Sequence, residues 1–317
     1  MNPSKQPVIR LIQSKSLAAC AAAALFAPAI HAAPMFGPAS PVAAFNTASS
    51  DQLTDLSPDG LTAILQSDRA GNFRIFSSKR PTLSDPWSVP SNADYAATNA
   101  GTNVGHAVLS PDGLSVFYQQ HPTIRQATRA NTSVPFSGGT LVPELNIGGG
   151  PPGYERPGKI SADGLRMYYE VYNGTNLYLY LADRPTTSDP WGVPTEGPFD
   201  ANINTPGVQN SEPYLTPDDL QLFYTSNRPG GLGGADIWWS SRASVADPFS
   251  VPMNLSSVNT AASDSSAELF GDTLFFTSNR NGSSDVFSTV AVPEPGSLAL
   301  LLAGGMGALL RRPRRGR

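Results

Sequence analysis

The chain has 317 residues, a formal net charge of −4 and a single cysteine, Cys20, which lies near the N-terminus. The body of the chain therefore forms no disulfide within itself and depends on packing for its stability. Residues 34–291 carry 24 acidic against 13 basic residues, a net charge of −11. An acidic body repels phosphate backbones, which argues against nucleic acid as a partner. Only His106 and His121 lie in the body, so the composition predicts no zinc site, no Ser-His-Asp catalysis and no cofactor.

Residues 1–33 have the pattern of a signal peptide. Three basic residues within the first fifteen precede an apolar run over residues 17–30, and small residues follow at Ala32 and Ala33. This order predicts that the chain is exported and that signal peptidase cleaves it after Ala32 or Ala33. Residues 17–20 also spell a lipoprotein box, but charged and polar residues leave no apolar stretch ahead of Cys20.

The body of the chain, residues 34–291, repeats with a period of about fifty residues. The sequence Leu56-Ser57-Pro58-Asp59-Gly60 recurs in altered form further along the chain, and its aspartate position falls at residues 59, 112, 163, 218 and 272. A period near fifty with a turn motif inside it predicts a β-propeller with one blade per repeat. Five repeats predict five blades, with six blades as the alternative.

Each repeat contains four predicted short strands. The innermost strand precedes the Ser-Pro-Asp-Gly turn, the second follows it, and a Ser-x-Arg-x-Gly hairpin leads to the third. The fourth is predicted to begin at Asp85-Pro86-Trp87 and at the corresponding residues of later repeats. An arginine such as Arg80 ends the third strand five residues before the aspartate, which predicts a charge-assisted Arg–Asp pair in each of three repeats.

The last repeat lacks its fourth strand, and the missing piece stands at the start of the body. Residues 36–51 align without gaps on residues 249–264, with Phe, Pro, Asn-Thr-Ala, Ser and Asp in register. We therefore predict that the N-terminal segment supplies the outer strand of the last blade. Closure of this kind removes the exposed edges that an open array would leave.

These repeats resemble the WD40-like propeller repeat found in the periplasmic β-propeller of the Tol system and in many exported bacterial proteins. The similarity covers nearly the whole body and implies the fold, but it says almost nothing about function. The Tol-system domain has six blades and an additional N-terminal domain, so its role is not carried over to this chain.

A binding site in a propeller is expected where the repeats differ from one another. The position three residues before the repeated Leu or Ile carries Leu53, His106, Pro157, Glu212 and Ser266 in turn. We therefore predict a binding mouth that consists of His106, Glu212, Asp51, Asp264 and Arg156. The alternative is that these side chains are solvated loop residues.

The C-terminal segment, residues 292–317, has three parts. Val292-Pro293-Glu294-Pro295 is followed by fourteen uncharged residues from 297 to 310 and by a tail that carries five arginines. This end resembles the PEP-CTERM sorting signal of Gram-negative bacteria. The resemblance implies transient anchoring in the inner membrane through a short transmembrane helix, cleavage near the motif by an exosortase, and release to the cell surface or the exterior. Fourteen residues span about 21 Å as a helix, less than a full bilayer core, and the arginines favour the cytoplasmic side.

Three functions remain open at this stage. The first is a non-catalytic exported propeller that binds a ligand, an extracellular polysaccharide or a partner protein. The second is a glycan-active hydrolase that uses carboxylates in the central channel of the propeller, for which Glu212 with Asp51 or Asp264 is the available set. The third is a structural component of the extracellular matrix. We predict no catalytic residue and no metal ligand.

Overall fold

The computed structural model describes residues 33–292, except residues 102, 148–154, 173 and 200–201. The predicted signal peptide before residue 33 and the sorting segment after Val292 lie outside the described residues. No helix in the described part of the chain combines the length and the hydropathy of a membrane span.

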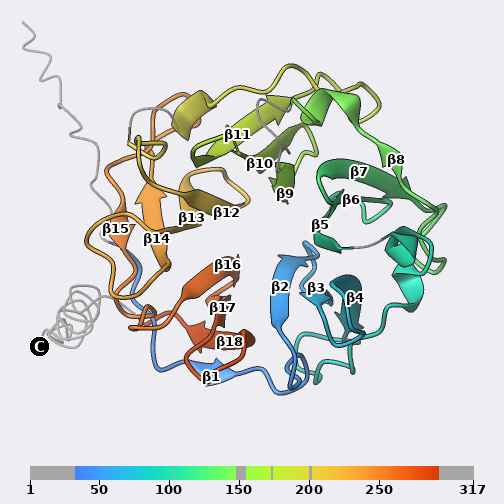
Figure 1. The fold of residues 1–317 in the computed structure, drawn as a ribbon, viewed down its shortest axis with the longest axis horizontal. Helices are drawn as coiled ribbons and strands as arrows, with labels where there is room; N and C mark the ends of the chain where they lie inside the picture. The colour runs from blue at the N-terminus through green and yellow to red at the C-terminus, as the bar shows by residue number, and fades with distance from the viewer. Residues whose placement is uncertain (1–32, 102, 148–154, 173, 200–201, 293–317) are drawn as a thin grey trace, which may run out of the picture. The chain divides into compact units, whose positions relative to one another are not determined.

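The described residues form an all-β propeller of five blades, as the repeat predicts (Figure 1). Each blade is an antiparallel sheet, and its innermost strand faces the ring axis. The innermost strands are β2 (Asp51–Leu56), β5 (Val104–Leu109), β9 (Glu155–Ile160), β12 (Asn210–Leu215) and β16 (Asp264–Phe270). The second strands are β3 (Thr62–Ser67), β6 (Ser115–Gln120), β10 (Arg166–Tyr172), β13 (Gln221–Ser226) and β17 (Thr273–Ser278). The third strands are β4 (Arg74–Lys79), β7 (Thr123–Thr128), β11 (Leu177–Asp183), β14 (Asp236–Ser241) and β18 (Asp285–Val290).

The outer strands are shorter and begin later than the sequence predicts. Asp85-Pro86-Trp87 and its equivalents lie in turns and extended loop, because the proline ring provides no N–H for a sheet at this point. The outer strands are β8 (Thr140–Leu141), β15 (Met253–Asn254) and β1 (Ser40–Pro41). In the other two blades the outer strand is reduced to one bridge, Ser77 with Ser91 and Leu181 with Thr195. Within the described residues, four short 3₁₀ helices lie in the loops: η1 (Ala93–Tyr95), η2 (Thr98–Ala100), η3 (Pro143–Leu145) and η4 (Gly197–Phe199).

The ring closes through the N-terminal segment, as predicted. Strand β1 pairs antiparallel with β18, with Ser40 opposite Ser288 and Pro41 opposite Phe287, and Figure 1 shows the two strands side by side. Phe36 forms a further bridge with Ala291. The last blade therefore contains strands from both ends of the described chain, in the order β1-β18-β17-β16.

An asparagine side chain completes the third strand in every blade. In the closing blade the Asn46 amide accepts a hydrogen bond from the N–H of Val286 at 2.7 Å and donates one to its carbonyl at 2.9 Å. The same two-way bond recurs in the other four blades, in the pairs Asn99–Ile75, Asn146–Ile124, Asn204–Leu179 and Asn259–Ile237. The amide thus replaces a neighbouring strand where the outer strand is too short to provide one.

The predicted Arg–Asp pairs do not form. The Arg80 guanidinium stacks over the Trp87 ring at 4.2 Å and donates to the Gly60 carbonyl at 2.9 Å, while the Asp85 carboxylate accepts from Thr82. The planar guanidinium prefers an aromatic face here because proline holds that ring in place before the outer segment. Equivalent stacks join Arg129 to Phe136, Arg184 to Trp191 and Arg242 to Phe249.

The core is distributed among the five interfaces between neighbouring blades. In the described residues five apolar clusters are found, and each combines side chains of two adjacent blades. The cluster between the last and first blades contains Phe45, Leu65 and Phe275, so the N-terminal segment also supplies core residues. Burial of these side chains therefore requires a closed ring.

We predict that removing the closing segment destabilises the whole propeller. A chain that begins at Asn46 loses β1 and the buried rings of Phe36 and Phe45, and we expect its melting temperature to fall by more than about 5 °C. Thermal unfolding followed by circular dichroism against a control chain of residues 34–292 measures the loss. Equal melting temperatures of the two chains would contradict closure by this segment.

Candidate functional site

A β-bulge interrupts each innermost strand at or directly after the position where the repeats differ. The strand register shifts there in all five blades. His106, Glu212 and Ser266 lie in the bulge with positive φ angles of 46°, 52° and 53°. A side chain at such a bulge turns toward the channel, so these three residues face the ring axis.

A polar side chain of four of the second strands, β3, β6, β10 and β13, holds the innermost strand of the next blade. Gln66 accepts from the N–H of His106 at 2.9 Å, and Glu170 accepts from the N–H of Glu212 at 2.8 Å. Thr225 accepts from the N–H of Ser266 at 3.2 Å. In the third blade the equivalent position carries Pro157, which has no N–H, and Gln119 donates to the Glu155 carbonyl instead. These bonds fix the rotation of one blade against the next.

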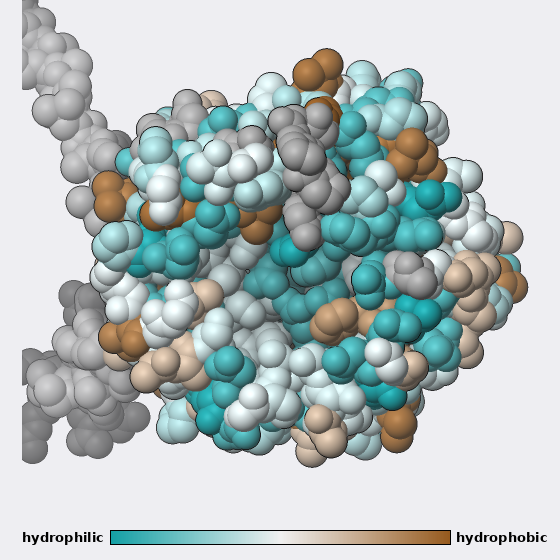
Figure 2. Space-filling model, viewed as in Figure 1, coloured by the Kyte–Doolittle hydropathy of each residue, from teal (hydrophilic) through white to brown (hydrophobic). Residues whose placement is uncertain are grey.

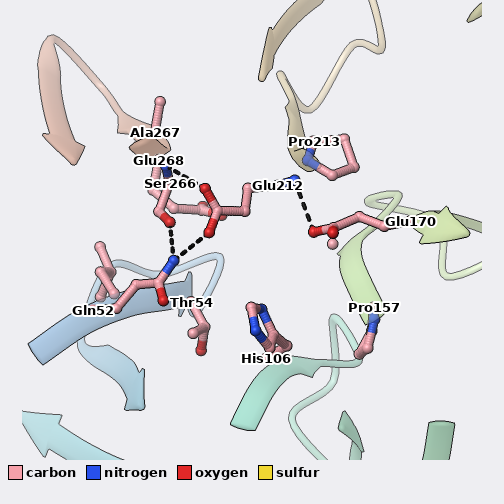
Figure 3. A pocket seen from close by; sticks show the side chains of 12 residues that line it. Gln52, Thr54, His106, Pro157, Glu170, Glu212, Pro213, Ser266, Ala267 and Glu268 are labelled. Atoms are coloured by element: carbon pink, nitrogen blue, oxygen red, sulfur yellow. Dashed lines mark hydrogen bonds between the residues drawn. The ribbon is translucent and has the colours of Figure 1, made fainter. Parts of the chain in front are cut away.

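Glu212 lies in the middle of the channel with its carboxylate surrounded by donors (Figure 3). It accepts from the hydroxyl of Thr225 at 2.8 Å, from the N–H of Ser266 at 3.0 Å, and from the side-chain amide of Gln52. The cavity around it measures about 20 Å³, room for roughly one water molecule. The carboxylate therefore links the first, fourth and fifth blades, and a sugar ring does not fit beside it.

Glu170 is a second carboxyl in this cavity, and it is fully buried. Burial raises its pKa to about 7, the nearby Glu212 adds to the increase, and Arg156 opposes it from 3.3 Å. The equivalent positions carry Gln66, Gln119, Thr225 and Thr277, all of them uncharged. A carboxyl with this pKa exchanges a proton near neutral pH. Because it accepts a hydrogen bond from the Glu212 N–H, however, it has a structural role in holding the next blade.

His106 points into the same cavity between Thr54 and Pro157 (Figure 3). Burial and the neighbouring Arg156 lower the pKa of its imidazole well below the ordinary value. The ring is therefore neutral at physiological pH. Arg156 and His106 also line a cavity of about 280 Å³ at the end of the channel where the innermost strands begin. In Figure 2 hydrophilic side chains surround the central hollow of the ring.

Asp51 and Asp264 belong to structural clamps and do not line the channel cavities. Both are fully buried. Asp51 pairs with Arg69 at 2.5 Å and accepts from Thr47, and Asp264 pairs with Arg280 at 2.6 Å and accepts from Thr260 in the same way. The structure thus brings His106, Glu212 and Arg156 together and places the two aspartates apart from them.

A buried ion pair crosses the channel beyond the bulges. Lys159 of β9 reaches Asp55 of β2 at 2.5 Å and Glu268 of β16 at 3.0 Å, so one ammonium group joins three blades. Burial alone would lower the pKa of Lys159, but the two carboxylates raise it. Burial also raises the pKa of Glu268, with Asp55 adding to the increase and Lys159 opposing it. Sequence reasoning missed this cluster, because its three residues belong to three different repeats.

A cavity much larger than the one around Glu212 opens on the far side of this ion pair, at the end of the channel formed by the Ser-Pro-Asp-Gly turns. It measures about 240 Å³, and we call it the funnel. A ring of five aliphatic residues surrounds it, one from each blade: Leu56, Leu109, Ile160, Leu215 and Leu269. Turn residues, among them Pro58, Pro111, Ala162, Pro217 and Phe270, form its rim. Asp55, Lys159, Tyr214 and Glu268 form its floor.

In the described residues no group of three or more His, Cys, Asp and Glu side chains is arranged to hold a metal ion. The floor of the funnel contains two carboxylates, but Lys159 lies between them at the position that a cation would take.

No protein-family model matches the chain, and no curated protein matches it either. Solved structures are similar in fold at low sequence identity. An endo-arabinase from Bacteroides thetaiotaomicron is 14% identical with a TM-score of 0.50, over 80% of this chain and 97% of that one. A putative TolB from Agrobacterium tumefaciens is 17% identical with a TM-score of 0.44, over 76% of each chain. An oligogalacturonate lyase from Vibrio parahaemolyticus is 12% identical with a TM-score of 0.41, over 81% and 94%. The chain shares its fold with the endo-arabinase, and this likeness carries no function.

We predict that Glu170→Gln removes a pH-dependent loss of stability. In the unfolded chain the Glu170 carboxyl ionises near 4.5, whereas in the folded protein it stays protonated up to about pH 7. The folded state therefore binds more protons in this window, and wild-type stability falls as the pH rises. The stability of the variant relative to wild type should increase between pH 4.5 and 7.5, by up to about 3 kcal/mol.

Urea unfolding at the two pH values measures this difference. Glu144→Gln, which removes a carboxyl on η3 outside the channel, is the control and should show a constant difference from wild type. A constant difference for Glu170→Gln as well would show that this carboxyl is ionised in the folded protein.

Proposed function

We propose that the protein is an exported, non-catalytic β-propeller that binds a ligand or part of a partner molecule in the funnel. The observation that carries this proposal is the cavity of about 240 Å³ on the ring axis, to which all five blades contribute an aliphatic side chain. An apolar cavity with a few convergent polar groups at its base has the usual composition of a small-ligand site.

The surroundings of the carboxylates support binding rather than hydrolysis. A glycosidase needs two carboxyl groups that face a sugar between them. Glu212 accepts three hydrogen bonds beside a cavity of about 20 Å³, and Asp51 and Asp264 are each held by an arginine. The three carboxylates that the sequence offers for hydrolysis, Glu212, Asp51 and Asp264, are thus held by structural partners.

The surface favours a small ligand or a partner protein over an extracellular polysaccharide. Polysaccharide-binding surfaces stack sugar rings on exposed aromatic faces, and tyrosine and tryptophan are the usual residues. Among the described residues no tyrosine or tryptophan side chain is exposed. A matrix role without a bound ligand would leave the funnel unexplained.

The two terminal segments support export and sorting as part of the same proposal. A signal peptide over residues 1–33 sends the chain to signal peptidase, and residues 292–317 anchor it transiently in the inner membrane for an exosortase. The propeller would then act at the cell surface or outside the cell.

We predict that the exported protein lacks residues before about Pro34 and is processed within residues 293–296. Intact-mass spectrometry of the protein recovered outside the inner membrane measures both ends. Recovery there of a chain that still carries the arginine tail would contradict the sorting proposal.

We predict that the purified propeller binds the neutral apolar dye N-phenyl-1-naphthylamine in the funnel and hydrolyses no polysaccharide. Ala162→Trp places a large ring on the exposed rim and should reduce dye affinity about tenfold or more, because it fills the cavity. The control is Ala70→Trp, which adds the same ring to the exposed hairpin between β3 and β4 at the other end of the channel.

Dye fluorescence measures the binding, and a reducing-sugar assay on plant and bacterial polysaccharides measures hydrolysis. Equal dye affinity of the two variants would overturn the funnel as the binding site. Turnover that is abolished by Glu212→Gln would establish the hydrolase instead.

A further inference from the structure

We propose that the ligand of the funnel is a linear aliphatic primary amine, whose alkyl chain contacts the aliphatic ring and whose ammonium group binds Glu268 on the floor. This inference rests on the proposed function, because it names the ligand class of the same cavity.

The charges on the floor favour a cation over an anion. Asp55 and Glu268 provide two carboxyl groups, and Lys159 provides one ammonium group that contacts both of them. An anionic ligand would add a third acidic group to one lysine that already has two partners. A second ammonium group makes the numbers equal once the Glu268 carboxyl has given up its proton, and the opposite charges then attract each other at short range.

Glu268 has one carboxylate oxygen, Oε1, that can accept a hydrogen bond from a ligand. Its side chain is buried, with 4% of the residue exposed, and it lines the cavity. Its Oε2 accepts from Lys159, and in the described part of the chain no side chain or backbone N–H donates to its Oε1. This oxygen is accessible from the cavity, so an ammonium group there can donate a charge-assisted hydrogen bond to it. Asp55, in contrast, also accepts from the N–H of Leu109 at 2.7 Å and is engaged on both oxygens.

The walls fit the rest of the molecule. A primary amine with several methylene groups is apolar along its length and charged at one end. The aliphatic ring and the Phe270 side chain surround the space above the floor, and the Tyr214 ring lies 5.1 Å from the Lys159 ammonium group. Tyr214 thus already serves as an aromatic neighbour for one cation, and a second would meet the same environment.

Charges of both signs surround the opening of the funnel. The turns that form its rim carry Asp59, Asp112, Asp163 and Asp218, each with a serine or threonine hydroxyl and a backbone N–H as donors. A guanidinium donates to a carbonyl of each of these turns, from Arg80, Arg129, Arg184 and Arg242. The choice of a cation is therefore made by the floor and not by the rim.

The test compares three probes of equal chain length on the folded propeller of residues 34–292: hexylamine, hexanol and hexanoate. Isothermal titration calorimetry at low salt should give hexylamine at least about tenfold higher affinity than hexanol, the effect of one charge-assisted hydrogen bond. Hexanoate should bind more weakly than hexanol. Equal affinity for hexylamine and hexanol, or a preference for hexanoate, would overturn the inference.

The matched variants are Glu268→Gln and Asp272→Asn. Each removes one carboxyl from the fifth blade, but Asp272 is exposed in the turn between β16 and β17 and does not line the cavity. Glu268→Gln should abolish the preference for the amine over hexanol, and Asp272→Asn should keep the preference. Retention of the preference in Glu268→Gln would overturn the role of this carboxyl.

A further readout follows from the protonation of Glu268. Burial raises the pKa of this carboxyl to about 8, with Asp55 adding to the increase and Lys159 opposing it. Binding of an ammonium group should therefore release a proton to the buffer near pH 7, and the binding enthalpy should differ between phosphate and Tris. Dye binding that is blocked by Ala162→Trp, together with no amine preference, would leave the funnel in place and refute only the amine. Absence of dye binding would refute the funnel itself.

Discussion

Closure of the ring is the constraint on which the rest of the structure depends. Each apolar cluster lies between two blades, so a blade buries both faces only when it has a neighbour on each side. The first and last blades become neighbours through one segment, in which β1 pairs with β18 and the Asn46 amide binds Val286 in both directions. Contacts of very long sequence separation thus secure a fold whose other strand pairs are local hairpins.

Within the closed ring the bulges determine how wide the channel is. A bulge directs a side chain toward the axis, and the polar residue of the preceding blade holds its backbone by a bond such as Gln66 to His106. With five blades the axis is narrow, and the cavity at this level measures about 20 Å³. Toward the Ser-Pro-Asp-Gly turns the aliphatic ring replaces the polar one, and the channel widens into the funnel of about 240 Å³.

The fold could be predicted from the sequence because the motifs that specify it are local and recur in the repeats. The turn motif marks every blade, and the register of Asn46 with Asn259 identifies the closing segment without any knowledge of the structure. The bounds of the outer strands were wrong, because the Asp-Pro sequence marks the loop ahead of the strand. The arginine partners were wrong as well, because charge suggested Asp85 whereas geometry brought Trp87 and Gly60 to Arg80.

The candidate site was less predictable, because neighbours across the ring axis share no local pattern. Lys159 and Glu268 are 109 residues apart and belong to different repeats, so only the closed ring places them together. Asp51 and Asp264 were predicted to border the binding mouth, but Arg69 and Arg280 hold them inside their own blades. Glu170 left one trace in the sequence, since its position is uncharged in the other four repeats.

The same comparison between repeats distinguishes structural charges from charges that need another explanation. An arginine that recurs at the same place in several blades, such as Arg80, has the same structural partners each time. The floor of the funnel follows no such rule, because the fifth position of the innermost strands carries Asp55, Val108, Lys159, Tyr214 and Glu268. Apolar side chains of similar volume would close the channel at least as stably as a buried cluster of one ammonium and two carboxyl groups. A cluster that stability does not require, placed at the base of an open apolar cavity, is most simply explained by a ligand that contacts it.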